Sequence, residues 1–103
     1  MTSWIKVAPL ASIESEDVMR FDHQGHSYAV YRVGDNVYAT DELCSHEQAH
    51  LSEGLVQDHV IECPKHNGRF DIRDGRPLRA PACIALRTYA TKIEDGTIFL
   101  GLG

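Results

Sequence analysis

The strongest constraint in the chain is a pair of short motifs that each join one cysteine to one histidine. Cys44 and His46 form a C-x-H motif, and after sixteen intervening residues Cys63 and His66 form a C-x-x-H motif. Thiolate and imidazole groups are common protein ligands of zinc and iron. The two matched clusters therefore predict that Cys44, His46, Cys63 and His66 hold a metal centre.

The mixed order of the ligands narrows the kind of centre. A four-cysteine cluster site would need four cysteines, and the common zinc finger places both cysteines in its first half and both histidines in its second. A Rieske centre is a [2Fe-2S] cluster in which two histidines replace two cysteines on one iron, so it needs this ligand set. A tetrahedral zinc ion bound by the same four residues remains the alternative, and it would make the protein a zinc-stabilised binding module without a redox role.

The residues around the ligands resemble the two cluster-binding loops of the Rieske iron–sulfur family. The matching residues are Cys44-Ser45-His46, Cys63-Pro64-Lys65-His66-Asn67-Gly68, Leu51, Gly54 and Phe70. The resemblance implies an all-β Rieske fold: an antiparallel β-sandwich with a small cluster-binding subdomain of two loops at one end. It also implies that Cys44 and Cys63 hold the inner iron, and that His46 and His66 hold the outer iron near the surface.

Length and composition suit one globular domain, because the chain has 103 residues, 43% of them hydrophobic and 24% charged. We expect a single domain over residues 1–103, with the cluster-binding subdomain at about 41–82. The formal charge of −5 argues against a nucleic-acid partner, which would require clustered Lys and Arg. No apolar run approaches the roughly 18 residues of a membrane helix, so no membrane partner is expected. The first residues lack the features of a secretory signal, which predicts a cytoplasmic protein with reduced thiols.

Alternating apolar residues and turn signals predict short strands along the whole chain. These strands are expected at 4–7, 18–21, 27–33, 37–40, 55–62, 69–72, 88–93 and 97–100, with at most one helical turn in 12–17. Residues 76–82 resemble the family's proline loop, which covers the cluster from a third side. His23 and His26 are interpreted as exposed loop residues, and His50 and His59 as surface residues or neighbours of the ligands. The remaining cysteine, Cys83, is expected to be a free thiol without a redox role.

Sequence differences from high-potential Rieske proteins predict a low potential. Respiratory members carry two further cysteines that join the ligand loops in a disulfide, and Ala49 and Lys65 stand at those positions here. A hydroxyl that commonly donates to the cluster is also missing from residues 67–69. With two thiolates and neutral imidazoles the oxidised centre is formally neutral, which raises its potential above that of four-cysteine clusters. We expect a value near the bottom of the Rieske range of roughly −150 to +300 mV.

From end to end, the chain resembles the stand-alone Rieske ferredoxins of bacterial aromatic-ring-hydroxylating dioxygenase systems. The resemblance implies a one-electron carrier between an NAD(P)H-dependent flavoprotein reductase and the Rieske centre of a terminal oxygenase, rather than an enzyme. A small Rieske subunit of another oxidoreductase, such as a nitrite reductase, is the alternative. Residues 41–64 contain six acids and no Lys or Arg, whereas 65–79 contain five Lys or Arg and two acids, and this asymmetry could orient docking.

Overall fold

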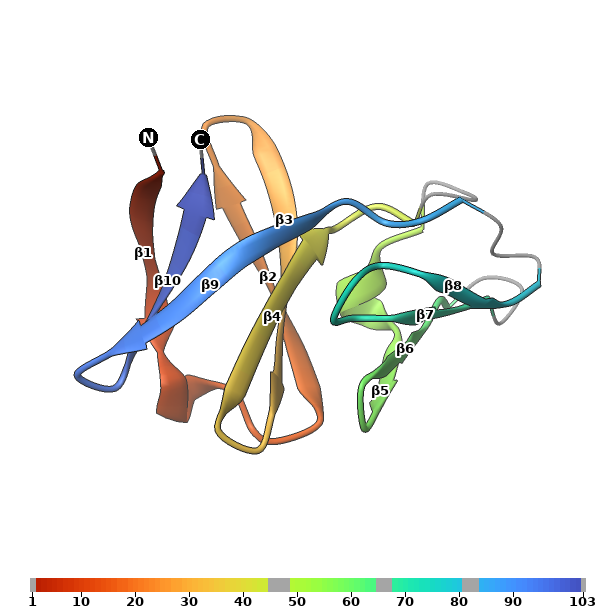
Figure 1. Cartoon of the computed structure of the whole chain (residues 1–103), viewed down its shortest axis with the longest axis horizontal. Helices are drawn as coiled ribbons and strands as arrows, with labels where there is room; N and C mark the ends of the chain where they lie inside the picture. Colours follow the sequence, from red (N-terminus) through yellow and green to blue (C-terminus); the bar gives the residue numbers. More distant parts are fainter. Residues whose placement is uncertain (1, 45–48, 65–67, 81–83, 103) are drawn as a thin grey trace.

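Two antiparallel sheets make up the fold in the computed structural model, which describes residues 2–44, 49–64, 68–80 and 84–102 (Figure 1). The larger sheet has the order β1-β10-β9-β4-β3-β2, and the smaller has the order β5-β6-β7-β8. The strands of the larger sheet are β1 (Ser3–Pro9), β2 (Asp17–His23), β3 (His26–Val33), β4 (Asn36–Asp41), β9 (Thr88–Glu94) and β10 (Thr97–Leu102). Those of the smaller sheet are β5 (Leu55–Gln57), β6 (Val60–Glu62), β7 (Arg69–Asp71) and β8 (Pro77–Arg79). The predicted all-β class is confirmed.

Tight turns join neighbouring strands of the larger sheet, as the turn residues predicted. Gln24 and Gly25 connect β2 to β3 with φ angles of 50° and 80°, and Asp95 and Gly96 connect β9 to β10 with φ angles of 51° and 74°. Two consecutive positive φ angles match the twist of an antiparallel hairpin. The final hairpin packs against β1 through β10, as expected. No helix in the described ranges is long and apolar enough to cross a membrane.

The interpretation of residues 55–62 as one strand was wrong. The segment folds back on itself as the hairpin β5–β6, in which Val56 pairs with Ile61. Asp58 turns the chain with φ of 53°, a conformation that Asp adopts more readily than most residues. The turn therefore needs no glycine, and both apolar residues of the pair are buried.

Smaller differences concern the helical turn, the histidines and the segment before residue 81. A short 3-10 helix, η1 (Leu10–Ser12), overlaps the predicted range of 12–17 only at Ser12, and a second, η2 (Leu51–Glu53), was not predicted. His23 and His26 form the closing pair of the β2–β3 hairpin and are not loop residues. Residues 77–79 of the expected proline loop form strand β8.

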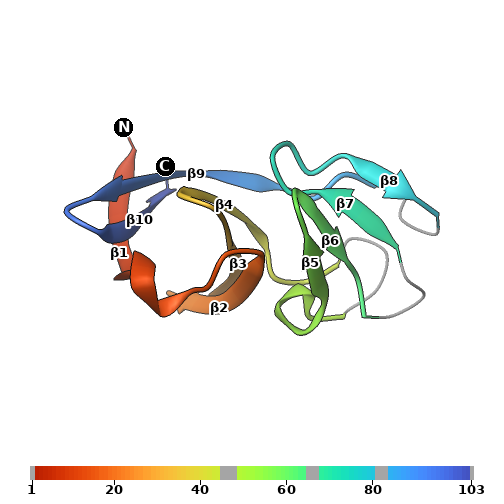
Figure 2. The same cartoon turned by 90° about the horizontal axis from the view of Figure 1, so that it is seen from below.

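The buried side chains form two hydrophobic cores that meet at β3. The curled larger sheet encloses one core, as the view along its axis shows (Figure 2). Its buried members are Ile13, Tyr28, Val30, Val37, Ala39, Ile98 and Leu100. The second core joins β3 to the smaller sheet and contains Ala29, Tyr31, Cys44, Ala49, Leu51, Val56, Ile61, Cys63, Phe70, Ile72 and Leu86. Because successive side chains of a strand point to opposite faces, β3 contributes alternate residues to each core.

Candidate metal centre

The first ligand loop leaves the larger sheet just after β4 and is closed at its base. The backbone N–H of Cys44 donates to the carbonyl oxygen of Ala49 at 2.9 Å, and Leu43 pairs with His50 in an isolated bridge. The loop thus starts and ends at neighbouring points of the scaffold. His46 lies between Cys44 and Ala49 in the sequence and outside the described residues.

The second loop connects β6 to β7 and is closed in the same way. The N–H of Cys63 donates to the carbonyl oxygen of Gly68 at 2.7 Å, again five residues further along the chain. His66 lies between these two residues in the sequence and also outside the described part. Both predicted thiolates therefore occupy the first position of a closed loop, and each loop carries one of the predicted histidines.

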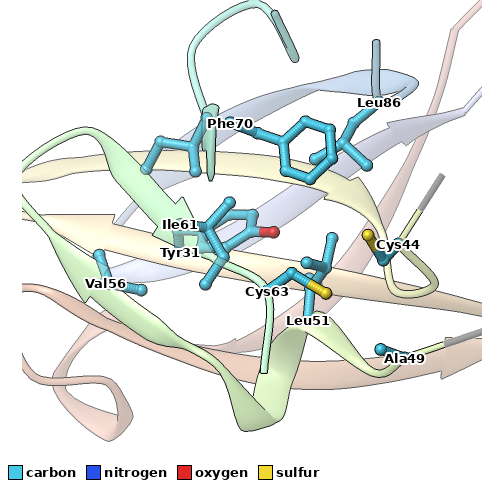
Figure 3. Packing of buried hydrophobic residues seen from close by; sticks show 11 residues of the cluster. Tyr31, Cys44, Ala49, Leu51, Val56, Ile61, Cys63, Phe70 and Leu86 are labelled. Atoms are coloured by element: carbon cyan, nitrogen blue, oxygen red, sulfur yellow. The ribbon is translucent and has the colours of Figure 1, made fainter. Parts of the chain in front are cut away.

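The fold brings the two cysteines into one apolar environment. Cys44 is 6% exposed and Cys63 is 2% exposed, and both belong to the second core. Figure 3 shows their sulfur atoms at the same end of this core, beside Leu51. Two thiols from separate loops, directed to one end of an apolar core, fit the thiolate half of a [2Fe-2S] site. The full four-ligand set remains a proposal, since His46 and His66 are not described.

Glu42 is a buried carboxylate beside the first loop that the sequence pattern did not single out. It is 0% exposed and lies two residues before Cys44. Its Oε1 accepts the backbone N–H of Ser52 at 2.9 Å, and its Oε2 accepts the Ser52 hydroxyl. His50 Nδ1 lies 3.3 Å from Oε2, at ion-pair distance, but makes no hydrogen bond among the described residues. His50 was predicted to be a surface or ligand-neighbouring residue, and its half-exposed side chain agrees with that prediction.

A buried hydroxyl pair joins β3 to β4 close to Glu42 and Cys44. The Tyr31 hydroxyl is 2.8 Å from Thr40 Oγ1, and both side chains are fully buried. Burial raises the pKa of Tyr31 well above its usual value, and the neighbouring charges of Glu42 and Cys44 raise it further. Tyr31 therefore stays a neutral phenol throughout the physiological range.

Two sets of hydrogen bonds hold the segment that follows β7, residues 72–86, in place. Asp71, 3% exposed, accepts hydrogen bonds from Arg73 at 2.7 and 3.0 Å, and these bonds lower the pKa of its carboxyl to about 2. Leu86 N–H donates to the carbonyl oxygen of Gly75 at 2.8 Å. Gly75 has φ of 80°, and a Cβ atom there would overlap the backbone oxygen of Leu86. Cys83 lies within this segment and outside the described residues.

A second polar group, also missed from sequence, joins β3, β4 and β9 on the larger sheet. His26 Nε2 lies 2.7 Å from Asp41 Oδ1, and the Tyr89 hydroxyl donates to the same oxygen at 2.5 Å. Burial and this hydrogen bond raise the pKa of Tyr89. The residues are up to 63 positions apart in sequence, so no local pattern could have indicated the group.

A β-sheet scaffold that presents two cysteine-bearing loops at one end of an apolar core defines a small metal-centre protein. The Rieske [2Fe-2S] domain family matches residues 3–90, and the chain belongs to that family. Membership favours the iron–sulfur interpretation of the site over zinc.

Similar proteins specify the branch of the family. The ferredoxin component of the naphthalene 1,2-dioxygenase system of Pseudomonas putida is 39% identical over 99 residues, which cover 96% of this chain and 95% of that protein. The ferredoxin of carbazole 1,9a-dioxygenase from Nocardioides aromaticivorans is 36% identical with a TM-score of 0.91, covering 95% of this chain and 96% of that one. A nitrite reductase small subunit from Mycobacterium tuberculosis has a TM-score of 0.89 at 18% identity, covering 100% of this chain and 97% of that one, and so shares the fold alone. The ferredoxin interpretation is therefore better supported than the nitrite reductase alternative.

Proposed function

We propose that the protein is the ferredoxin component of an aromatic-ring-hydroxylating dioxygenase system. It would accept single electrons from an NAD(P)H-dependent flavoprotein reductase and pass them to the Rieske centre of a terminal oxygenase. The observation that carries the proposal is the pair of buried cysteines at matched positions of two closed loops, within a chain that matches dioxygenase ferredoxins over nearly its whole length. In this role the protein is a carrier, and the ring chemistry belongs to the oxygenase.

The proposed ligands are Cys44, His46, Cys63 and His66. A Rieske cluster supplies reversible one-electron chemistry when it is bound. The chain's own contribution is to keep both thiols in the apolar core and to fix the ends of both ligand loops with backbone hydrogen bonds. Residues 1–103 would act as one domain, with the cluster-binding part at about 41–82, in the cytoplasm.

The proposed docking face surrounds the two ligand loops. Two apolar side chains near these loops are exposed: Leu43 by 44%, at the base of the first loop, and Leu78 by 45%, in the strand that pairs with the residue after the second. Transient redox complexes bury small areas, so a few exposed apolar side chains at the exit point of the electron suit such an interface. A related solved structure is a complex of reduced oxygenase and oxidised ferredoxin in carbazole 1,9a-dioxygenase, with a TM-score of 0.91 and 36% identity over 94% of this chain and 91% of that one.

Charge pairing within the protein refines the electrostatic part of the docking proposal. Arg69 binds Glu62 at 3.2 Å, and Arg73 binds Asp71, so part of the positive charge in 65–79 is compensated locally. Steering by the remaining charges would still make the rate of electron transfer fall as salt is added. A rate that does not change across a salt series would contradict steered docking, but it would not affect the proposal that the chain binds a [2Fe-2S] cluster.

Anaerobic purification followed by metal analysis and spectroscopy tests the proposal. We expect two irons and two acid-labile sulfides per chain, a rhombic EPR signal with average g below 2 after reduction, and NADH-driven turnover with a dioxygenase reductase and oxygenase. Protein containing one zinc and no iron would refute the proposal. A midpoint potential above about +100 mV would contradict the low potential that the sequence predicts.

A further inference from the structure

Glu42 differs from the other buried carboxylate of the described residues in how its charge is balanced. Asp71 faces the guanidinium groups of Arg73 and Arg76 at 2.7 and 3.5 Å. Glu42 faces two hydrogen-bond donors of Ser52 and the imidazole of His50, and no Lys or Arg side chain in the described ranges forms an ion pair with it. Neutral donors solvate a carboxylate but do not cancel its charge. A negative charge on Glu42 is therefore not balanced by a direct ion pair with Lys or Arg, although the guanidinium of Arg20 on β2 interacts with it electrostatically.

The backbone of Glu42, just before the first ligand loop, bonds to the chain just after that loop and to β3. Its carbonyl oxygen accepts the N–H of Leu51 at 2.7 Å, and its own N–H donates to Ser27 at 3.1 Å. Together with the side-chain bonds to Ser52, these contacts hold the chain just before Cys44 against the chain just after Ala49. A fully buried carboxylate is costly unless its hydrogen bonds are satisfied, so these contacts also explain how Glu42 can remain buried.

We propose that Glu42 is a positioning residue that holds the first ligand loop in place and whose buried charge lowers the reduction potential of the centre. Adding an electron next to a fixed negative charge is unfavourable, and the effect is strong in the poorly screened interior. This inference rests on the proposed function, because it requires a redox centre between the two loops. It assigns part of the expected low potential to a charge outside the ligand set.

The test compares two single-charge changes in the holoprotein. Glu42→Gln removes the buried charge and keeps the size of the side chain, whereas Glu53→Gln removes one charge from an exposed residue of the neighbouring η2. We expect the midpoint potential of Glu42→Gln to rise several-fold more than that of Glu53→Gln. The rise should persist in high salt, while any shift in the Glu53 variant disappears because exposed charges are screened. An equal or smaller rise in Glu42→Gln would overturn the proposal.

Ser52→Ala separates the charge from a general loosening of the loop. This variant removes the hydroxyl donor but keeps the carboxylate and the backbone N–H of residue 52, so its potential should stay closer to the wild-type value than that of Glu42→Gln. A structural disturbance alone would shift the potentials of both variants by similar amounts. If Glu42→Gln loses its cluster, Glu42→Asp decides, because it keeps the charge: a bound cluster with a potential near the wild-type value supports the proposal, and a lost cluster or a raised potential overturns it. Wild-type protein that contains zinc would instead refute the proposed function, before any potential is measured.

Discussion

Replacing Gly75 by Ala should destabilise the contact between Gly75 and Leu86, and with it the second core. Gly25 provides a matched control, because both glycines have φ of 80° but a Cβ atom on Gly25 meets nothing within 4 Å. A positive φ costs a non-glycine residue about 1–2 kcal/mol, and both variants share that cost. At Gly75 the new Cβ also overlaps the carbonyl oxygen of Leu86, well inside the 3.0 Å limit of real Cβ contacts. Displacing a packed backbone adds about 2 kcal/mol to the loss of stability.

Thermal unfolding of the holoproteins at one scan rate measures this difference. For a domain of about this size, 2 kcal/mol corresponds to a midpoint roughly 8–16 °C lower for Gly75→Ala than for Gly25→Ala. Bleaching of the visible absorption should follow the same order, because Leu86 packs in the core that contains both cysteines. Midpoints within about 2 °C of each other would show that the approach of Leu86 to Gly75 does not stabilise the segment.

Three further outcomes are expected. The hydrogen bonds from Arg73 lower the pKa of Asp71 from 3.8 to about 2, which stabilises the folded protein by at most about 2 kcal/mol. This stabilisation is present above the unfolded pKa of 3.8 and is lost as the pH falls to about 2. Denaturant unfolding curves should show this pH dependence for the wild type and not for Asp71→Asn. Tyr31→Phe should cost about 1 kcal/mol in the same assay, because Thr40 keeps its hydrogen bond to a backbone carbonyl, and a loss above about 3 kcal/mol would contradict this. Cys83→Ser should leave the visible spectrum unchanged, in contrast to Cys63→Ser, and a lost spectrum would show that the third thiol matters.

Local signals were sufficient for the strands and for the spacing of the ligand motifs. Gly25, Gly34 and Gly96 marked hairpin turns because positive φ angles there favour glycine. The positions of Cys44 and Cys63 at the starts of two loops followed from their neighbours in sequence. Whether His46 and His66 complete the ligand set stays a prediction, because neither residue is described.

The features that sequence could not predict depend on contacts between distant segments. Asp58 turns the chain without a glycine, so the β5–β6 hairpin resembled one continuous strand. Glu42 looked like one of six acids in a charged stretch, and only the fold shows that it is buried, with η2 bonded to its carboxylate through Ser52. The contact between Asp41 and Tyr89 likewise depends on the pairing of β4 with β9, which no local pattern specifies.

The position of β3 in both cores limits how this protein can be re-engineered. Ala29 and Tyr31 pack with the cysteines, while Tyr28 and Val30 pack inside the curled sheet. A chimera that received residues 41–82 from a related ferredoxin would acquire new ligand loops but keep the original Ala29 and Tyr31 that pack against the cysteines. An exchange of the cluster-binding part should therefore include the alternate residues of β3 that face the cysteines, although β3 ends more than ten positions before Cys44. Exchange of the loops alone should leave a badly packed second core.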